Sequence, residues 1–441
     1  MQRSVSGFSK RTKTEKIEWI VEQHFEDPEA AKTLLTSYWH SDPNLQDKHD
    51  EFIENTLSNF YLPLGVAPNF LINGRYYTLP MVIEESSVIA AAGKSAKYWA
   101  NKGGFRTQIL GIEKVGQVHF LCREKAQIVQ NFFDANKLEL INSCSALTER
   151  MQKRGGGLLD LQLIDKTSEL EDYYQLHATF DTQDAMGANF INSVLEQLAD
   201  QLVIIGKQYA PFSAGKEPLE VVMSILSNYV PNCLVRAEVQ CPVNQLEPEE
   251  GMGQKTFAEK IIQAVNIAQV EPHRAVTHNK GIMNGVDAVV VATGNDFRAI
   301  EAGIHAYAAR NGRYQSLSDA FIENDVFTFR VDLPLAVGTV GGLTKLHPMV
   351  QWSLDLLQQP TAKELMQIIA VAGLAQNFAA LRSLVTSGIQ KGHMKMHLLN
   401  ILNQLNASTE QKKLALEHFK NNTINVYFSK SIFTIVKVSD I

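Results

Sequence analysis

The sequence predicts an α+β protein, and three observations support this fold class. Between residues 107 and 202, the patterns follow the order strand, helix, strand, strand, helix, which is typical of a ferredoxin-type α/β sandwich. From residue 217 onward, long helical patterns dominate. No G-x-G-x-x-G follows a first strand, which argues against a doubly wound dinucleotide-binding sheet.

The N-terminal part begins with a short predicted helix, Thr14–Gln23, with Thr14 as its expected cap. Alternating side chains predict a strand over Arg75–Ile83. Glu84-Glu85-Ser86-Ser87 then opens a helix of small residues, Val88–Ala100. A helix so rich in alanine and glycine can bring its backbone close to a neighbouring helix or a ligand.

The ferredoxin-type unit is expected to begin after Gly103-Gly104. Its expected strands are Thr107–Ile112, Gln117–Cys122, Leu158–Ile164 and Tyr174–Phe180, and its expected helices are Glu124–Asn136 and Phe190–Leu202.

The C-terminal half is expected to be mostly helical, over Glu217–Tyr229, Lys255–Val270, Arg298–Arg310, Ala362–Ser387 and 392–405. Ser408 with Gln411 forms a capping box for a further helix, and the last residues, 423–438, alternate as a strand. The segment from Pro272 is expected to be a loop or helix edge. A buried strand, Val286–Ala292, should follow it and end in a Gly-Asn-Asp turn.

Composition narrows the function classes. The formal net charge of -6 and pI near 6.1 argue against nucleic acid as a partner, because phosphate binding needs concentrated positive charge. Apolar runs such as Ile368–Ala375 are too short to span a bilayer, and the N-terminus lacks the apolar core of a secretion signal. A cytoplasmic protein is therefore expected, with its four scattered cysteines reduced and no zinc site.

The segment from residue 272 to 296 carries the densest chemistry. It places Arg274, His278, Asn279, Lys280 and Asn284 ahead of an apolar run that ends at Asp296. An acid beside a lysine shifts the pKa values of both groups, and a charged lysine aimed at a carbonyl oxygen stabilises an oxyanion.

Each of these residues also has a structural interpretation. A lone lysine such as Lys280 is usually a solvated surface charge, and Asp296 can simply cap a following helix. The pair Glu84-Glu85 can favour a helix N-terminus through the macrodipole, or one of the two can be a general acid. Adjacent carboxylates on a strand point in opposite directions, so at most one would face a site.

Glycine-rich turns and two histidines give weaker signals. Gly338-Thr-Val-Gly-Gly342 and Gly155–Gly157 can cradle a phosphate or carboxylate, but such turns are common. His393 and His397 would share one helix face, although the sequence supplies no further metal ligands. One histidine near the C-terminus is better interpreted as a proton donor or as having no role.

Six blocks in order resemble class II hydroxymethylglutaryl-CoA (HMG-CoA) reductase, the soluble bacterial and archaeal type. They are Val82-Ile-Glu-Glu-Ser-Ser-Val-Ile-Ala-Ala-Ala92, Asp184-Ala-Met-Gly-Ala-Asn189, Arg274-Ala-Val-Thr-His-Asn-Lys-Gly-Ile-Met-Asn284, Ala292-Thr-Gly-Asn-Asp296, Gly338-Thr-Val-Gly-Gly342 and Gly392-His-Met394.

The resemblance implies reduction of a thioester to an alcohol with two nicotinamide hydrides. Lys280 would polarise both carbonyls, Glu85 would donate a proton, and Asp296 would hold the two in one hydrogen-bond network. His393 would protonate the departing CoA thiolate. Further implied contacts are Ser87, Arg274 and Asn284 to the substrate, Asp184, Met186, Gly187, Asn189 and Asn228 to the cofactor, and Lys10 and Arg11 to CoA.

The resemblance also implies an architecture. A largely helical substrate and CoA domain (1–111 and 227–387) would be interrupted by a ferredoxin-like cofactor domain (112–226, not a Rossmann fold). A C-terminal flap (388–441) would carry His393. The enzyme would be a homodimer with shared active sites, and it would need no metal.

Three points depart from the family pattern. Ser58 stands where glycine is usual. Gly7-Phe-Ser-Lys-Arg11 matches the family's basic CoA-phosphate segment only loosely, so Lys10 and Arg11 are weak candidates. In NADH-using members an Asp precedes the triple glycine, whereas here Thr148 takes that position with Arg150 nearby, which predicts NADPH preference. The alternatives are an NAD-linked enzyme that oxidises mevalonate and a non-catalytic CoA-binding relative.

Overall fold

The computed structural model describes residues 4–212, 219–248, 251–386, 398, 402 and 406–418. His393, His397, most of the helix expected over 392–405 and the strand expected over 423–438 lie outside the described residues. The described chain is a mixture of helix and sheet.

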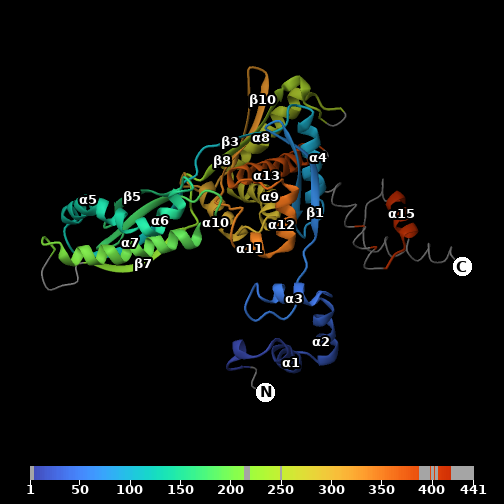
Figure 1. Ribbon diagram of the computed structural model, residues 1–441. Coiled ribbons are helices and arrows are strands. Elements are labelled where there is room, and N and C mark those ends of the chain that lie inside the picture. The colour runs from blue at the N-terminus through green and yellow to red at the C-terminus, as the bar shows by residue number, and fades with distance from the viewer. Residues whose placement is uncertain are drawn as a thin grey trace.

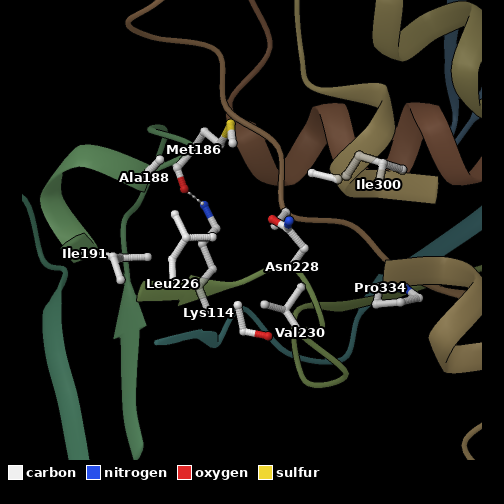
Figure 2. Close-up of a pocket in the computed structure, with 12 residues that line it drawn as sticks. Lys114, Met186, Ala188, Ile191, Leu226, Asn228, Val230, Ile300 and Pro334 are labelled. Carbon is white, nitrogen blue, oxygen red and sulfur yellow. Dashed lines mark hydrogen bonds between the residues drawn. The ribbon is translucent and has the colours of Figure 1, made fainter. Parts of the chain in front are cut away.

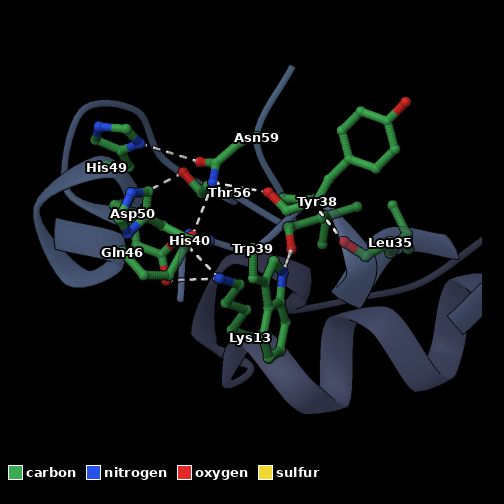
Figure 3. A network of polar contacts seen from close by, with 12 residues as sticks. Lys13, Leu35, Tyr38, Trp39, His40, Gln46, His49, Asp50, Thr56 and Asn59 are labelled. Carbon is green, nitrogen blue, oxygen red and sulfur yellow. Dashed lines mark hydrogen bonds and ion pairs between the residues drawn. The ribbon is translucent and has the colours of Figure 1, made fainter. Parts of the chain in front are cut away.

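The chain starts with an N-terminal arm, η1 (Phe8–Lys10), α1 (Lys13–His24), α2 (Pro28–Ser37) and α3 (Pro43–Asp50), which extends from the main body (Figure 1). The arm contacts the body where the ring centroids of His49 and His347 lie 5.5 Å apart. The helix α1 begins at Lys13, one residue earlier than expected. Its cap is Thr12 and not Thr14, and Thr12 forms a capping box with Glu15. Lys13 holds the arm together through an ion pair of 2.6 Å with Asp50, which also accepts from Gln46 (Figure 3).

The next elements confirm the expected strand and small-residue helix. The strands β1 (Leu64–Ile72) and β2 (Arg75–Val82) form an antiparallel hairpin, and α4 (Val88–Ala100) packs on β1. The packing is close at this contact, since a Cβ on Gly65 of β1 would lie 2.6 Å from the side chain of Ile89 on α4.

A separate unit follows, consisting of β4 (Lys114–Cys122), α5 (Ala126–Ser143), α6 (Ser145–Gln152), β5 (Gly157–Asp165), β6 (Tyr173–Asp181), α7 (Ala188–Gln208) and β7 (Leu219–Ser227). It projects to one side of the body (Figure 1). Its antiparallel sheet has the order β5-β6-β4-β7, and the buried side chains of the sheet, α5 and α7 form their own hydrophobic core. The expected order from Gln117–Cys122 to Phe190–Leu202 is present, with α6 as an addition. The expected first strand of the unit, Thr107–Ile112, is wrong, because residues 106–109 pair with residues 235–238 in a different sheet.

The helix expected over Glu217–Tyr229 is wrong, because this segment contains the strand β7. Val221, Val222 and Ile225 are β-branched, and pairing with β4 satisfies the backbone of this edge strand. Its outer side chains remain exposed, so the apolar residues do not mark one buried face in the sequence.

The largest core contains a second sheet that the sequence did not predict in full. The strand β3 (Arg106–Ile109) was expected, whereas β8 (Leu234–Pro242), β9 (Ser318–Glu323) and β10 (Val326–Pro334) were not; η2 (Val243–Gln245) follows β8. The sheet order is β3-β8-β10-β9, and all three pairings are antiparallel. The C-terminal half is therefore less helical than expected.

Helices complete this core: α8 (Gln254–Val270), α9 (Pro272–Ala292), α10 (Phe297–Ala308), α11 (Leu343–Leu346), α12 (Pro348–Leu356) and α13 (Ala362–Val385), with α15 (Thr409–His418) beyond them. The expected loop and buried strand within 272–292 are wrong, since the whole segment is the single helix α9. Glu271 caps this helix and Pro272 occupies its first turn. A helix buried on most sides has no polar stripe, so its apolar run resembles a buried strand.

The two long helices α9 and α13 cross at very short distance. A Cβ on Gly285 would lie 2.3 Å from the carbonyl oxygen of Ala372, and one on Gly373 would lie 2.9 Å from Val286. Only glycine allows this approach. Among the described helices, α13 is long and apolar enough to cross a membrane by length and composition, but 67% of its apolar window is buried inside the protein.

Candidate functional site

One cavity brings together five of the residues that the sequence singled out. Its lining includes Glu85, Ser87, Arg274, Lys280 and Asn284, and its volume is about 550 Å³. The loop before α4 supplies the first two residues, and successive turns of α9 supply the other three. The rest of the wall comes mainly from α4 and α13, so the crossing of α9 and α13 shapes the cavity.

The centre of the cavity is an ion pair. The Nζ of Lys280 lies 2.5 Å from Oε2 of Glu85, and Nδ2 of Asn284 lies 3.5 Å from the same oxygen. The side chains of Lys280 and Glu85 are 59% and 36% exposed, so a substrate can reach both. An ammonium can stabilise a developing oxyanion, and the adjoining carboxyl can deliver a proton to the same oxygen.

The neighbouring loop holds Ser87 in an unusual backbone conformation. Its φ of 77° is left-handed, which is uncommon for a residue other than glycine. Ser87 stands at the N-cap position of α4, yet its side chain makes no capping hydrogen bond. The hydroxyl is therefore available to the cavity.

Behind the ion pair, a buried polar network supports α9. The Nε2 of His278 lies 2.7 Å from the hydroxyl of Ser318, which donates to Asn377 on α13 at 2.9 Å. Burial, together with the positive charge of Arg274, lowers the pKa of His278 to about 3. His278 is therefore a neutral supporting residue, and Asn377 is a cavity residue that the sequence did not single out.

Asp296 does not join Lys280 within one chain. It is the N-cap of α10, where its carboxylate accepts from the backbone amides of Arg298 and Ala299 and pairs with the Arg298 side chain at 3.2 Å. Lys280 and Ala292 are on the same helix α9, and a rise of about 1.5 Å per residue separates them by roughly 18 Å. Asp296 therefore caps α10, as its structural interpretation predicted.

A second pocket lies between the unit of β4 to β7 and the main body. Met186, Asn228 and Lys114 line it, together with Ile300 and Pro334 from the body (Figure 2). Gly187, before α7, has a φ of 94°, and a Cβ there would lie 2.4 Å from Thr182. This turn therefore requires glycine.

Of the other predicted cofactor residues, Asp184 and Asn189 adjoin this turn, whereas Thr148 and Arg150 lie on α6. Asp184 accepts from the backbone amide of Ala362 at 2.8 Å, which fastens the turn to the start of α13, and Asn189 is exposed on α7. Thr148 is buried, and its hydroxyl donates to the carbonyl of Cys144, so it does not face a ligand. Arg150 is exposed on α6.

Lys114 was missed by sequence reasoning, because a single lysine at the start of a strand forms no motif. It is 6% exposed and opens β4. Burial lowers the pKa of its ammonium.

The weak CoA candidates Lys10 and Arg11 lie in the N-terminal arm, and Arg11 is stacked over Trp19. Within the described residues, no group of acidic, His and Cys side chains could hold a metal ion.

Comparisons with known proteins agree on one family. A family model described as hydroxymethylglutaryl-coenzyme A reductase matches residues 13–398. The 3-hydroxy-3-methylglutaryl-coenzyme A reductase of Archaeoglobus fulgidus is 35% identical over 436 residues, which cover 98% of this chain and 94% of the relative. The probable reductase of Borreliella burgdorferi is 31% identical over 441 residues, covering 98% and 97%.

A solved structure is also similar. The class II 3-hydroxy-3-methylglutaryl-CoA reductase from Streptococcus pneumoniae, bound to NADPH in open conformations, has a TM-score of 0.71 and 39% identity. The match covers 87% of this chain and 100% of that chain.

The buried His278 predicts how stability depends on pH. Its folded-state pKa of about 3 lies below its ordinary value of 6.5, so the unfolded chain takes up a proton first as the pH falls. The stability that this group contributes is complete above pH 6.5 and decreases toward pH 3. His278→Gln keeps a donor for Ser318 but cannot take up a proton. When the pH is lowered from about 7.5 to about 5, we expect the Tm of this variant to fall by several degrees less than the Tm of the wild type.

Thermal melts at both pH values measure this difference. The exposed His273 on the same helix provides the control, and His273→Gln should lose as much Tm as the wild type. Equal losses in His278→Gln and in the wild type would contradict the prediction.

Proposed function

Because the chain belongs to the hydroxymethylglutaryl-coenzyme A reductase family, we propose that Lys280 and Glu85 carry out its reaction, the reduction of HMG-CoA to mevalonate and CoA. The chain is an oxidoreductase of the mevalonate pathway. The observation that carries the proposed roles is the 2.5 Å ion pair between these two residues in a cavity that is open to substrate.

The residues act in two successive reductions. Bound NADPH supplies one hydride to the carbonyl carbon in each. In the first, the ammonium of Lys280 stabilises the oxyanion of the hemithioacetal, whose carbon–sulfur bond then breaks to give mevaldehyde and a CoA thiolate. In the second, Lys280 polarises the aldehyde carbonyl. Glu85, which takes up a proton from solvent through the open cavity before this step, gives that proton to the reduced oxygen, which becomes the alcohol.

The same cavity offers contacts for the rest of the substrate. Arg274 is half-buried on α9, nearly two turns before Lys280, and a guanidinium binds a carboxylate through two hydrogen bonds. We assign the terminal carboxylate of the substrate to Arg274, and its hydroxyl to Ser87 and Asn284. Lys10 and Arg11 remain weak candidates for the CoA phosphate.

The position of Asp296 supports a homodimer with shared active sites. Roughly 18 Å of helix separate Lys280 from the end of α9, so an Asp296 that tunes Lys280 must come from a second chain. Asp296 is 33% exposed in its side chain and is accessible to such a partner. In this dimer each chain supplies Lys280 to one site and Asp296 to the other.

The proposed domains are those expected from the sequence. Residues 1–111 and 227–387 would form the substrate and CoA domain, and 112–226 the ferredoxin-like cofactor domain. Two separate hydrophobic cores support this division. We assign the protonation of the CoA thiolate to His393, in a C-terminal flap over 388–441.

We also propose a cytoplasmic location, because the similar reductases of Archaeoglobus fulgidus and Borreliella burgdorferi are archaeal and bacterial.

The cofactor would lie between the two domains. The pocket of Met186 and Asn228 is lined mainly by small and apolar side chains. The exposed cations Arg150 and Arg154 favour a 2′-phosphate, and the similar streptococcal enzyme binds NADPH. Thr148 is buried, so we assign the preference for NADPH to the cations.

Substitution of Glu85 tests the catalytic proposal, and the same substitution of the neighbouring Glu84 is the control. Glu85→Gln keeps the shape of the side chain but removes the proton that it would donate, so kcat should fall by about 10²-fold or more. Glu84→Gln, at an exposed carboxyl without a contact to Lys280, should stay within about threefold of wild type. Loss of absorbance at 340 nm with HMG-CoA and NADPH measures both, and turnover that survives Lys280→Ala would refute the assignment.

Subunit complementation tests the shared site. Lys280→Ala and Asp296→Asn should each be nearly inactive alone. Co-expression gives about half heterodimers, each with one intact site, so activity should recover to about a quarter of wild type. A site built within one chain predicts no recovery, because every chain then lacks one of the two residues.

The cofactor preference is tested at Arg150. Arg150→Asp places a carboxylate near the predicted 2′-phosphate, so kcat/KM should fall by about tenfold or more with NADPH and much less with NADH. Lys153→Asp is a control for general surface charge, because Lys153 already pairs with Glu149. A wild-type enzyme that prefers NADH would contradict the assignment.

A further inference from the structure

The cofactor pocket contains a buried positive charge that the proposed reaction does not use. Lys114 is 6% exposed, and its ammonium is hydrogen-bonded to a hydroxyl and two backbone carbonyls, none of which is charged. Lysine is rarely buried without a carboxylate partner, because removing its charge from water is costly. Such a position calls for a specific compensating environment.

Backbone and hydroxyl oxygens provide that environment. The ammonium donates to Oγ1 of Thr182 at 2.6 Å and to the carbonyl of Ala185 at 2.8 Å. It also donates to the carbonyl of Met186 at 3.0 Å (Figure 2). An ammonium has three N–H groups, and all three are used, so the geometry is that of the charged form with no donor left for a ligand. The nearest acid, Asp181, accepts from Gln183 instead.

The turn that Lys114 holds is also fixed from its other side. A Cβ on Gly338 would lie 2.3 Å from the amide nitrogen of Met186, and the amide of Thr339 donates to the carbonyl of Asp184 at 2.8 Å. Asp184 in turn accepts from Ala362 at the start of α13. The positive charge therefore has a fixed position at the wall of the pocket that Met186 and Asn228 line.

We propose that Lys114 is a selectivity residue that makes this pocket hold the reduced nicotinamide more tightly than the oxidised one. This inference rests on the proposed function of the pocket. The nicotinamide ring is neutral when reduced and carries a positive charge when oxidised, and a fixed buried cation repels only the charged ring. An enzyme that uses two hydrides per substrate must release one oxidised cofactor before the second reduction, and Lys114 promotes that exchange.

Lys114 thus has two separable effects. Its hydrogen bonds position the turn, which affects both forms of the cofactor equally. Its charge acts only on the difference between the two forms. The ratio Kd(NADP⁺)/Kd(NADPH) isolates the charge, because a purely structural role would change both constants together and leave the ratio unchanged.

Calorimetric titration of the full-length protein with each cofactor measures the ratio. Lys114→Met should lower it by about fivefold, and Lys114→Arg should keep it near the wild-type value. Lys102→Met is the matched control, because the Lys102 side chain is also buried but pairs with Glu247 away from the pocket. It should leave the ratio unchanged even where Tm falls.

A second pair of variants keeps the test decisive if Lys114→Met does not fold. Thr182→Asp places a carboxylate against the ammonium and should lower the ratio, whereas Thr182→Val removes one acceptor and should weaken both cofactors equally. A ratio within twofold of wild type in Lys114→Met, or in Thr182→Asp if the former is unfolded, would overturn the proposal. Turnover of HMG-CoA by the wild type is recorded in parallel. If the wild type is active and the ratio in the variant is unchanged, the role of Lys114 is refuted but the proposed function of the enzyme is not.

Discussion

The crossing of α9 and α13 determines most of the site. Gly285 and Gly373 allow the two helix backbones to approach so closely that each helix becomes a wall of the same cavity. The helix α9 then contributes Arg274, Lys280 and Asn284 to the cavity, and α13 supplies Asn377, which supports α9 through Ser318. A larger side chain at the crossing would separate the helices and with them the groups that surround the substrate.

The sequence predicted those parts of the fold whose patterns are local. The hairpin strand β2, helix α4 and most of the unit from β4 to α7 have clear alternation or clear ends. The prediction from sequence failed where a segment is buried or exposed on several sides, because its hydrophobic residues then show no helical or strand periodicity. The helix α9 is surrounded by other elements, so its apolar run resembles a strand, and the edge strand β7 exposes apolar side chains that suggested a helix.

The candidate site divides in a similar way. Glu85, Ser87, Arg274, Lys280 and Asn284 were predicted from motifs, and the chain folds them into one cavity. The place of Asp296 depends on the length of a helix that the sequence did not reveal. Thr148 aligned with a ligand position but its side chain turns inward, and Lys114 belongs to no motif because its partners are backbone carbonyls.

The two hydrophobic cores differ in how much of the chain each one needs. The core of the smaller unit uses residues from 118 to 219 alone, so it is complete soon after those residues leave the ribosome. The larger core joins residues before 116 to residues as late as 381 in α13. During synthesis the inserted unit can therefore fold first, and the first segments of the chain must wait, with their apolar faces uncovered, until α13 emerges and closes the core around them.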